Sequence, residues 1–371
     1  MKALKKFLLI NIKKNFCVNC NLKIRLMKIG ILTAGGDCPG LNAAIRGVAK
    51  TALLDKKMKV LGISSGFLGL IENEYFEIKE KHLSGILTMG GTILGTSREK
   101  PFRKSGNYMM EIDKPEIIRR NYNKLGLDCL VCIGGNGTMK TAWRLSELGM
   151  NIIGLPKTID NDVWGTEFTF GFDSAVTIAA EAIDRLHSTA NSHKRIMVIE
   201  VMGHHAGWIA LYAGVAAGGD IILIPEIKHE NEIIAKYLDQ RAKAKKEYSI
   251  VVVAEGIVNG SKKGAGTSVA KMINKLTGLE TRETVLGYVQ RGGSPTPMDR
   301  ILATRYGAHA TELIARGKFG NMVAIQHGDI TAVPLNMVSD RVRTVPDKHP
   351  LILQARNMGT CFGDKSCKSL Y

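Results

Sequence analysis

The sequence has no long hydrophobic run and few aromatic residues. None of its apolar stretches approaches the roughly 18 residues that a membrane-spanning helix requires. Aromatic residues make up only 6% of the 371 residues, and the body of the chain has no Lys/Arg-rich block with aromatic residues between its charges. Because such blocks are typical of proteins that bind nucleic acids, we expect neither a membrane nor a nucleic acid as a partner.

Cysteine is scarce as well: the chain has seven, an odd number in a long sequence. This count argues against a disulfide scaffold and predicts reduced thiols, as in a cytoplasmic protein. Two C-x-x-C pairs, Cys17/Cys20 and Cys129/Cys132, leave a shared zinc site as a minor alternative. The second pair lies in the run CLVCIGG, which is typical of a buried strand in which cysteine acts as a small apolar residue.

Acidic residues are absent from residues 1–28, which carry +8 of the formal net charge of +17. This segment is similar to a signal peptide only at its basic start, because its apolar part is short and no small-x-small cleavage site follows. Our leading interpretation is that residues 1–26 are a basic N-terminal extension that need not belong to the native protein. A basic surface-binding tail is the alternative. The basic balance of the remaining chain favours anionic metabolites as ligands.

Glycine, by contrast, is abundant, with 40 residues that fall mostly in short clusters between apolar runs. The repeated pattern is an apolar strand, a glycine turn and an amphipathic helix, as in KIGILTAGGDCPGLNAAIRG. Continuous apolar strands such as SIVVVA indicate parallel sheets that are covered on both faces. We therefore predict an α/β fold with two similar three-layer α/β/α lobes and mostly parallel sheets. The active site is expected in the cleft between the lobes, at the carboxyl ends of the strands.

Two glycine clusters, residues 35–40 and 134–138, each follow a predicted strand and open a predicted helix. Glycine lets backbone N–H groups approach a phosphate, and the start of the helix favours its negative charge. Neither cluster has the P-loop pattern or the dinucleotide-binding pattern, which disfavours a nicotinamide dehydrogenase. Tight βα turns without a ligand are the alternative. The presence of both clusters together with Gly90-Gly91-Thr92 favours phosphate binding.

The stretch Pro156–Asp162, PKTIDND, holds two carboxylates two residues apart after a predicted strand. One carboxylate could accept a proton from a substrate hydroxyl, and the other could help to hold a metal ion. Lys157 could meet a phosphate. A capped turn is the alternative interpretation, because Asp and Asn are common at turns and helix starts.

Basic residues beside glycine turns add to this pattern. Arg98 follows one turn, and Arg291 precedes another, Gly292-Gly293. Arginine at such places suits bidentate phosphate binding, although surface ion pairs are the commoner use. His204 and His205 close a predicted strand, where alternating side chains cannot both face one site, so a zinc site is disfavoured. His204 could instead donate a hydrogen bond to a sugar or a phosphate.

Together these motifs resemble the phosphofructokinase family over about residues 27–330. The resemblance rests on GGDCPGLNAAIRG, GGTILGTSR, GGNGT, PKTIDND, SHKRIMVIEVMG, VAEG and TRETVLGYVQRGGSPTPMDR, in this order. It implies Mg²⁺-dependent phosphoryl transfer from ATP to the 1-hydroxyl of fructose 6-phosphate, the committed step of glycolysis in the cytoplasm. It also implies a homo-oligomer, a tetramer or a dimer. The phosphoryl-donor lobe would comprise residues 27–171 with about 290–340, and the fructose 6-phosphate lobe residues 172–289 with about 341–371.

The resemblance also implies roles for individual residues. Asp160 would be the general base, with Thr158, Asp162 and Lys157 beside it as further catalytic residues. The donor would be held by Gly35, Gly36, Arg98, Gly135, Asn136, Gly137 and Thr138, and Asn136 would be a weak metal ligand. The sugar phosphate would be bound by Thr158, Asp160, Arg195, Met202, Gly203, His204, Glu255, Arg282, Tyr288, Gln290 and Arg291. Arg195 and Arg282 would reach into the site of a neighbouring subunit.

Several positions depart from the family pattern. Asn136 stands where the family has a metal-binding Asp, and Lys157 stands where many members have Gly. ATP users have Gly at position 137, whereas pyrophosphate users have Asp there and Lys at position 157. Because an Asp at 137 would crowd and repel the ATP α-phosphate, Gly137 favours ATP.

Two alternatives stay open. Lys157 leaves a pyrophosphate-dependent enzyme as the first. Asn136 and His204, which stands where many members have Arg, leave a non-catalytic sugar-phosphate-binding paralogue as the second. Tyr288, in place of the family's His, also bears on the sugar site. An effector pocket could use Arg46, Lys50 and Lys243 or Lys245, but His187 stands where Arg is expected.

Overall fold

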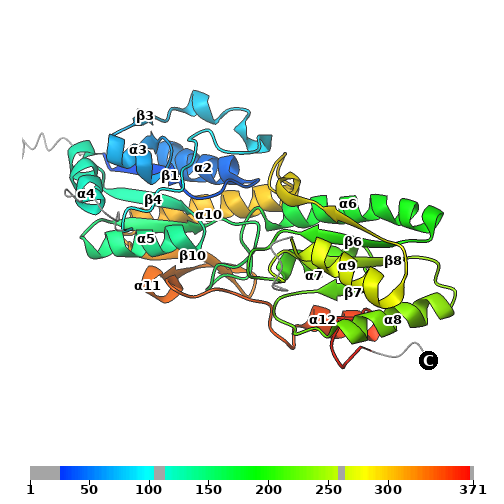
Figure 1. Cartoon of the computed structure of the whole chain (residues 1–371). Coiled ribbons are helices and arrows are strands. Elements are labelled where there is room, and N and C mark those ends of the chain that lie inside the picture. The colour runs from blue at the N-terminus through cyan, green and yellow to red at the C-terminus, as the bar shows by residue number, and fades with distance from the viewer. Residues whose placement is uncertain (1–25, 104–112, 258–263, 368–371) are drawn as a thin grey trace, which may run out of the picture.

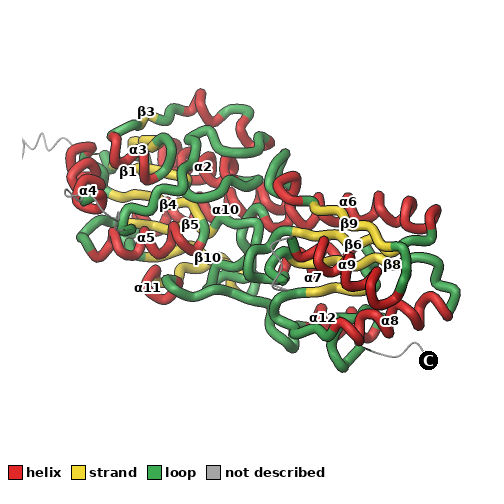
Figure 2. Tube along the Cα trace, in the orientation of Figure 1, coloured by secondary structure: helices red, strands yellow, loops and turns green. Residues whose placement is uncertain are grey.

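Two sheets lie side by side and form two lobes, as the computed structural model shows (Figure 1). The structure describes residues 26–103, 113–257 and 264–367. The chain builds most of the first lobe, crosses to the second, returns to the first through α10 and ends on the second (Figure 1). In Figure 2 the strands form two groups, and loops gather where the groups meet. The predicted α/β class with two lobes is confirmed.

The first sheet has seven strands in the order β11-β10-β5-β4-β1-β2-β3. Its parallel strands are β1 (Lys28–Thr33), β2 (Lys59–Ile63), β4 (Cys129–Gly134), β5 (Ile152–Pro156) and β10 (Asn321–Gln326). The edge strands β3 (Tyr75–Glu77) and β11 (Asp329–Pro334) pair antiparallel with β2 and β10. Every residue of β4 is buried, which explains its continuous apolar sequence.

Helices cover both faces of this sheet. Cys129 and Val131 of β4 pack on the side of α2 (Leu41–Lys50) and α10 (Pro297–Ala315), whereas Leu130 and Cys132 face the opposite side. That side carries α3 (Phe67–Glu72), α4 (Lys114–Leu125), α5 (Asn136–Glu147) and α11 (Leu335–Val338). Short helical turns complete the lobe: η1 (Thr51–Asp55), η2 (Glu80–Leu83) and η3 (Ile86–Thr88). The alternation of side chains along β4 thus produces the three layers.

The second sheet has four parallel strands in the order β7-β8-β6-β9. These are β7 (Ile221–Leu223), β8 (Ser249–Ala254), β6 (Ile196–Val201) and β9 (Thr281–Val285). One face packs on α6 (Phe172–His193) and α7 (Trp208–Ala216), and the other on α8 (Asn231–Lys243) and α9 (Ala265–Thr277). The turn η4 (Gly287–Gln290) and the helix α12 (Pro350–Asn357) complete this lobe. The boundaries between the lobes stay a prediction.

A buried polar contact joins the starts of α6 and α10. The Asp299 carboxylate accepts hydrogen bonds from the Ser174 N–H, at 2.8 Å, and from the Ser174 hydroxyl, at 2.6 Å. The Thr296 N–H donates to that hydroxyl at 3.0 Å, and burial raises the pKa of Asp299 to about 6. This contact fixes the segment between η4 and α10, which carries Arg291.

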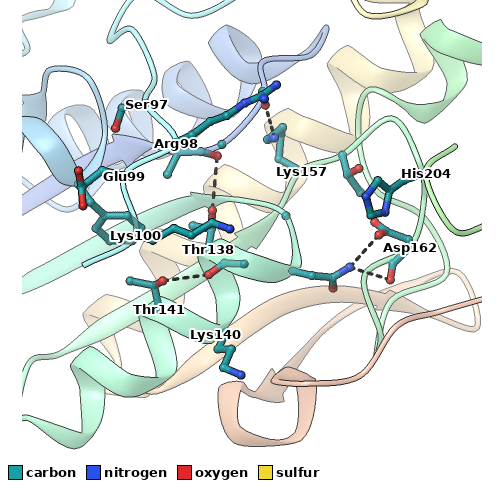
Figure 3. Close-up of a pocket in the computed structure, with 18 of the residues that line it drawn as sticks. Ser97, Arg98, Glu99, Lys100, Thr138, Lys140, Thr141, Lys157, Asp162 and His204 are labelled. Carbon is teal, nitrogen blue, oxygen red and sulfur yellow. Dashed lines mark hydrogen bonds between the residues drawn. The ribbon is translucent and has the colours of Figure 1, made fainter. Parts of the chain in front are cut away.

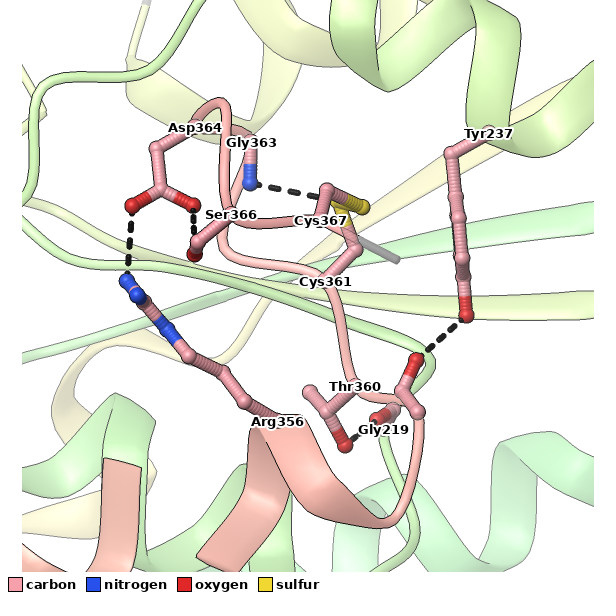
Figure 4. The surroundings of a disulfide bond; sticks show 10 residues. Gly219, Tyr237, Arg356, Thr360, Cys361, Gly363, Asp364, Ser366 and Cys367 are labelled. Atoms are coloured by element: carbon pink, nitrogen blue, oxygen red, sulfur yellow. Dashed lines mark hydrogen bonds and ion pairs between the residues drawn. A yellow bond between two sulfur atoms is a disulfide. The ribbon is translucent and has the colours of Figure 1, made fainter. Parts of the chain in front are cut away.

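The C-terminal segment docks beside β7, and its cysteines depart from the sequence prediction (Figure 4). Cys361 forms a parallel bridge to Ile221 and a disulfide with Cys367. The prediction of reduced thiols is therefore wrong for this pair. A tight turn brings the two residues together, in which the Cys367 N–H donates to the Asp364 carbonyl at 3.0 Å. The Asp364 carboxylate also binds Arg356 at 2.7 Å.

The other cysteines follow the prediction as far as the structure describes them. Cys38, Cys129 and Cys132 are free and buried. The pair Cys17/Cys20 lies outside the described residues, and the other half of the alternative zinc site, Cys129 and Cys132, is buried on opposite faces of β4. Within the described ranges, none of the helices has both the length and the hydrophobicity to cross a bilayer.

Candidate active site

A cavity of about 710 Å³ opens where the carboxyl ends of β1, β4 and β5 meet the second lobe (Figure 3). His204, after β6, and Arg291, after η4, complete it from the other side. The predicted site residues that line it are Gly35, Gly36, Arg98, Gly135, Asn136, Gly137, Thr138, Lys157, Thr158, Asp160, Asp162, His204 and Arg291. The structure thus brings the predicted donor residues and catalytic residues to one cavity, while their roles stay predictions.

Two cationic side chains donate hydrogen bonds to the backbone of the first glycine turn, residues 35–40. The Lys157 ammonium, at the end of β5, donates a hydrogen bond to the Gly36 carbonyl. Arg291 Nη1 donates to the Asp37 carbonyl at 3.0 Å. A Cβ atom at Gly36 would lie 2.6 Å from that Nη1, so a side chain at this position would displace the guanidinium group of Arg291. Lys157 is buried, and burial lowers the pKa of its ammonium.

The second glycine turn leaves open space at the start of α5. A Cβ atom at Gly137 would meet no described atom within 4 Å. The Gly137 carbonyl accepts a hydrogen bond from the Thr141 hydroxyl at 2.9 Å, in the first turns of the helix (Figure 3). An anion in this space would meet the positive end of the helix dipole.

Asp160 is the most unusual titratable group of the cavity. Its Oδ1 is buried and finds no hydrogen-bond partner among the described residues. Burial raises the pKa of Asp160 to about 6, and the charge of Asp162 adds to this effect while Arg291 opposes it. The Asp160 N–H donates to the Thr158 hydroxyl at 3.1 Å, which shapes the loop. A carboxylate with a free oxygen and a pKa near neutrality is suited to accept a proton.

Asn136 and Asp162 form a hydrogen-bonded pair beside Asp160. Asn136 Nδ2 donates to Asp162 Oδ2 at 2.8 Å and to the Asp162 carbonyl at 3.2 Å (Figure 3). Burial raises the pKa of Asp162, and the hydrogen bond from Asn136 opposes that rise. The Oδ1 atom of Asn136 is buried and unpartnered within the described part of the chain.

These oxygens fit Mg²⁺, which binds few protein carboxylates and keeps its other sites for water and substrate phosphates. The candidate ligand atoms are Asn136 Oδ1 and the carboxylate oxygens of Asp160 and Asp162. Across the described ranges, however, no group of three or more His, Cys, Asp or Glu residues could hold a metal ion. Water and bound donor phosphates would therefore have to supply the remaining ligands.

A hydrogen-bonded turn after β6 places His204 in the cavity. The Glu255 carboxylate accepts the His204 N–H at 2.8 Å and the Gly203 N–H at 3.3 Å. The buried Gln290 accepts the Met202 N–H at 3.3 Å. Met202, Gly203, Glu255 and Gln290 therefore support the turn, and His204 is the residue that lines the cavity.

The two histidines are not arranged as the sequence suggested. We placed them on a strand, but β6 ends at Val201, and His204 has a φ of 53° in a turn. The alternation argument against a shared site therefore does not apply, because their rings lie 3.8 Å apart. The described residues still show no metal cluster there.

Arg195 and Arg282 lie elsewhere. They bind the same carboxylate, Glu280, at 2.8 Å and 2.9 Å, and neither is among the described residues that line the cavity. Tyr288 is 72% exposed. None of these three predicted sugar-site residues is among the described residues that line this chain's own cavity, and Arg282 lies in β9, the edge strand of the second sheet.

Sequence reasoning missed a basic rim on the donor side. It consists of Lys100, Arg103, Lys140 and Arg144, and the Arg144 guanidinium stacks 3.8 Å from the centre of the Phe102 ring. A signal was present in GGNGTMKTAWR, since residues 137, 140, 141 and 144 recur at helical spacing. This spacing places them on the face of α5 that continues from the glycine turn.

Two of the residues considered for an effector pocket, His187 and Lys50, have other partners. His187 Nε2 lies 2.7 Å from the Ala217 carbonyl oxygen, and its Nδ1 lies 3.2 Å from the Tyr248 hydroxyl. The Lys50 ammonium lies 4.0 Å from the Glu80 carboxylate. Regulation of the protein stays a prediction.

Comparison with known proteins gives one consistent family. The family model described as Phosphofructokinase matches residues 28–314. The chain is 59% identical over 337 residues to ATP-dependent 6-phosphofructokinase 3 of Bacteroides thetaiotaomicron, covering 91% of this chain and 100% of the relative. It is 57% identical over 355 residues to an ATP-dependent 6-phosphofructokinase of Spirochaeta thermophila, covering 90% and 97%.

Solved structures agree on the fold. Phosphofructokinase from Saccharomyces cerevisiae superposes with a TM-score of 0.75 at 32% identity, over 84% of this chain and 45% of the longer yeast chain. Pyrophosphate-dependent phosphofructokinase from Marinobacter aquaeolei gives a TM-score of 0.77 at 24% identity, over 86% of both chains. The second likeness bears on the fold alone.

The buried charge of Asp160 should make the native state less stable. Because burial raises the pKa of this carboxyl to about 6, the folded chain binds its proton more tightly than the unfolded chain does. Asp160→Asn should therefore stabilise the protein by about 1–3 kcal/mol above pH 7, and the gain should disappear towards pH 4.

Urea unfolding of D160N and the wild type from pH 4 to pH 8 measures this gain. The control is Asp347→Asn, at an exposed position on the surface. A D160N variant that is no more stable than the wild type at pH 8 would show that Asp160 carries no desolvation cost.

Proposed function

The chain belongs to the phosphofructokinase family, and on that premise we propose that it transfers the γ-phosphoryl group of ATP to the 1-hydroxyl of fructose 6-phosphate. The products are fructose 1,6-bisphosphate and ADP. Because this is a reaction of glycolysis, we also propose that the protein acts in the cytoplasm. The supporting relatives have this activity in their names and align over nearly all of their length.

The observation that carries the mechanism is the free, buried Oδ1 of Asp160. We propose that Asp160 accepts the proton of the sugar 1-hydroxyl while that oxygen attacks the γ-phosphorus. The bond from this phosphorus to the β–γ bridging oxygen breaks, and ADP leaves with the electron pair. Arg291 and His204, on the second-lobe side, could receive the sugar phosphate. The protein thus supplies position, charge and one base, which phosphoryl transfer mainly requires.

The donor side favours ATP over pyrophosphate. Gly137 leaves the space in which an ATP α-phosphate could lie, and the basic rim extends the cavity beyond the glycine turns. Lys157 was the reason to consider pyrophosphate, but its ammonium is bound to the Gly36 carbonyl and supports the turn. The relatives named above are ATP-dependent.

Mg²⁺ belongs to this proposal because the oxygens of Asn136, Asp160 and Asp162 fit it. When bound, the ion would neutralise charge on the donor phosphates. Asn136 is a neutral ligand, so we expect it to contribute less than the Asp of other family members. Its amide instead holds Asp162 in place.

We further propose that the active site is shared between subunits of a homo-oligomer. Among the described residues, Arg195 and Arg282 do not line this chain's cavity but converge on Glu280, so they could serve a neighbour. The same edge exposes the large apolar side chains Val285 and Val289, which suits a protein contact. The number of subunits, two or four, is left to experiment.

Donor choice tests the proposed function directly. Residues 27–371, supplied with fructose 6-phosphate, Mg²⁺ and either ATP or pyrophosphate, should form fructose 1,6-bisphosphate with ATP only. In G137D, a carboxylate enters the open space beside the donor, so ATP turnover should fall. Product with pyrophosphate alone would support the first alternative. Binding of the sugar phosphate without product from either donor would support the non-catalytic alternative.

The role of Asp160 predicts both a rate and a pH dependence. Asp160→Asn should lower kcat by about 10²- to 10⁴-fold, because the variant cannot accept the proton. In the wild type, kcat/KM should fall below about pH 6, where the carboxyl becomes protonated. Steady-state kinetics from pH 5 to pH 9 measure both effects, with D347N as the control. Near-normal turnover by D160N would exclude a general base at this position.

A shared site predicts complementation between two inactive variants. D160N and R282A should each be inactive alone, the second because it binds the sugar phosphate poorly. After random assembly, about a quarter of all sites should combine an intact Asp160 with an intact Arg282 from the neighbour, and in a mixed dimer about half of the sites should do so. Activity after co-expression, with mixed oligomers confirmed by two affinity tags, measures this. Inactive mixed oligomers would show that Arg282 serves its own chain.

A further inference from the structure

The loop that carries Asp160 contains a left-handed residue. Asn161, which follows Asp160, has a φ of 51°, a region that residues with side chains rarely adopt but that Asn tolerates better than most. Asn161 is 1% exposed, and its side chain is fully used. Its Nδ2 donates to the Glu167 carbonyl at 3.2 Å, and its Oδ1 accepts the Thr169 N–H at 3.0 Å. The backbone carbonyls of the loop must then find partners outside it.

Those partners come from a distant part of the chain, residues 339–349, which we name the strap. The strap runs from α11 of the first lobe to α12 of the second. Arg343 Nη1 donates to the Asn161 carbonyl at 3.0 Å, and the Arg343 N–H donates to the Asp162 carbonyl at 2.8 Å. One residue of the strap thus binds both carbonyls that follow Asp160.

The second lobe fixes the guanidinium of Arg343 in turn. It stacks on the ring of Trp208 at 3.9 Å, at the start of α7, and Trp208 Nε1 donates to the Arg343 carbonyl at 3.2 Å. Further along the strap, the Val345 N–H donates to the Glu226 carboxylate at 2.9 Å. Burial lowers the pKa of Arg343, so this cation is kept in place at a desolvation cost. Such a planar, stacked cation with a directed N–H suits positioning.

We propose that Arg343 is a positioning residue for the catalytic loop, because it holds the Asn161 and Asp162 carbonyls against Trp208 and so sets where the Asp160 carboxylate lies. The effect is geometric, since the contacts run to the backbone. This inference rests on the proposed function, in which Asp160 is the base. It predicts that the second lobe helps to place a base that belongs to the first.

The test is Arg343→Met, which keeps the length of the side chain and removes its donors. With both substrates saturating, kcat per nucleotide-binding site should fall about 10- to 100-fold, as expected for a base displaced by a fraction of an ångström to one ångström. The acid limb of the pH profile should shift with it. KM for ATP should stay unchanged, because the glycine turns are not touched. An unchanged kcat and pH profile in R343M would overturn the proposal.

Arg341→Met is the matched control. Arg341 lies on the same strap and stacks on Trp164 at 4.6 Å, and its N–H binds the Val338 carbonyl. R341M should therefore keep the wild-type kcat and pH profile. If R343M does not fold, R343K decides: a lysine can donate to one carbonyl but cannot stack a planar group, so kcat should lie below the wild type. A wild-type kcat and pH profile in R343K would overturn the proposal.

A second readout does not depend on turnover. Amide hydrogen exchange over residues 157–170 should be faster in R343M than in the wild type and in R341M. Equal exchange in all three would overturn the positioning role, whatever the activity. The wild-type rate of fructose 1,6-bisphosphate formation tests the proposed function separately, so the two failures can be told apart.

Discussion

The burial of one carboxylate is the constraint on which the arrangement of this site depends. Asp160 lies in a cavity with an unpartnered oxygen, and its charge is costly there. A protein can keep such a group only if the surrounding backbone cannot relax to satisfy it. Hydrogen bonds accordingly hold the loop in three places: to Thr158 within the loop, to Thr169 just after it and to Arg343 of the strap. The rigidity of this loop keeps Oδ1 of Asp160 free for a substrate.

Charge in the cavity is arranged to support that carboxylate without neutralising it. Lys157 and Arg291 are close enough to influence buried acids, but the hydrogen bonds found for them run to carbonyls of the first glycine turn. The residue that binds Asp162 is the amide Asn136, so this part of the cavity has two carboxylates, Asp160 and Asp162, where the family pattern would give three. A third negative charge here would raise the pKa of its neighbours further. The presence of Asn instead of Asp at position 136 therefore favours the charged forms of Asp160 and Asp162.

Much of the fold could be predicted because it depends on local pattern. Fully buried strands such as β4 and β8 are almost entirely apolar, and a glycine turn follows where a backbone approaches a ligand. The same logic located the cavity, since parallel strands bring their carboxyl ends to one edge. The β6–α7 turn was misjudged because its conformation depends on Glu255, which lies far along the sequence. No local signal marks such a contact.

The least predictable parts are those with no repeating pattern. The strap is irregular and polar, and nothing in its letters shows that Arg343 lies against Trp208 and the catalytic loop. The Cys361–Cys367 disulfide lies in a turn that is placed by the bridge of Cys361 to Ile221, which is a tertiary contact.

The chain crosses three times between its lobes, and the last two crossings each place an arginine at the site. On the return to the first lobe Arg291 donates to the Asp37 carbonyl, and on the last crossing, along the strap, Arg343 donates to the Asn161 carbonyl. A single crossing would leave both the glycine turn and the catalytic loop without these cations. The two-lobed fold thus supplies from the second lobe the donors that hold the first lobe's site in place.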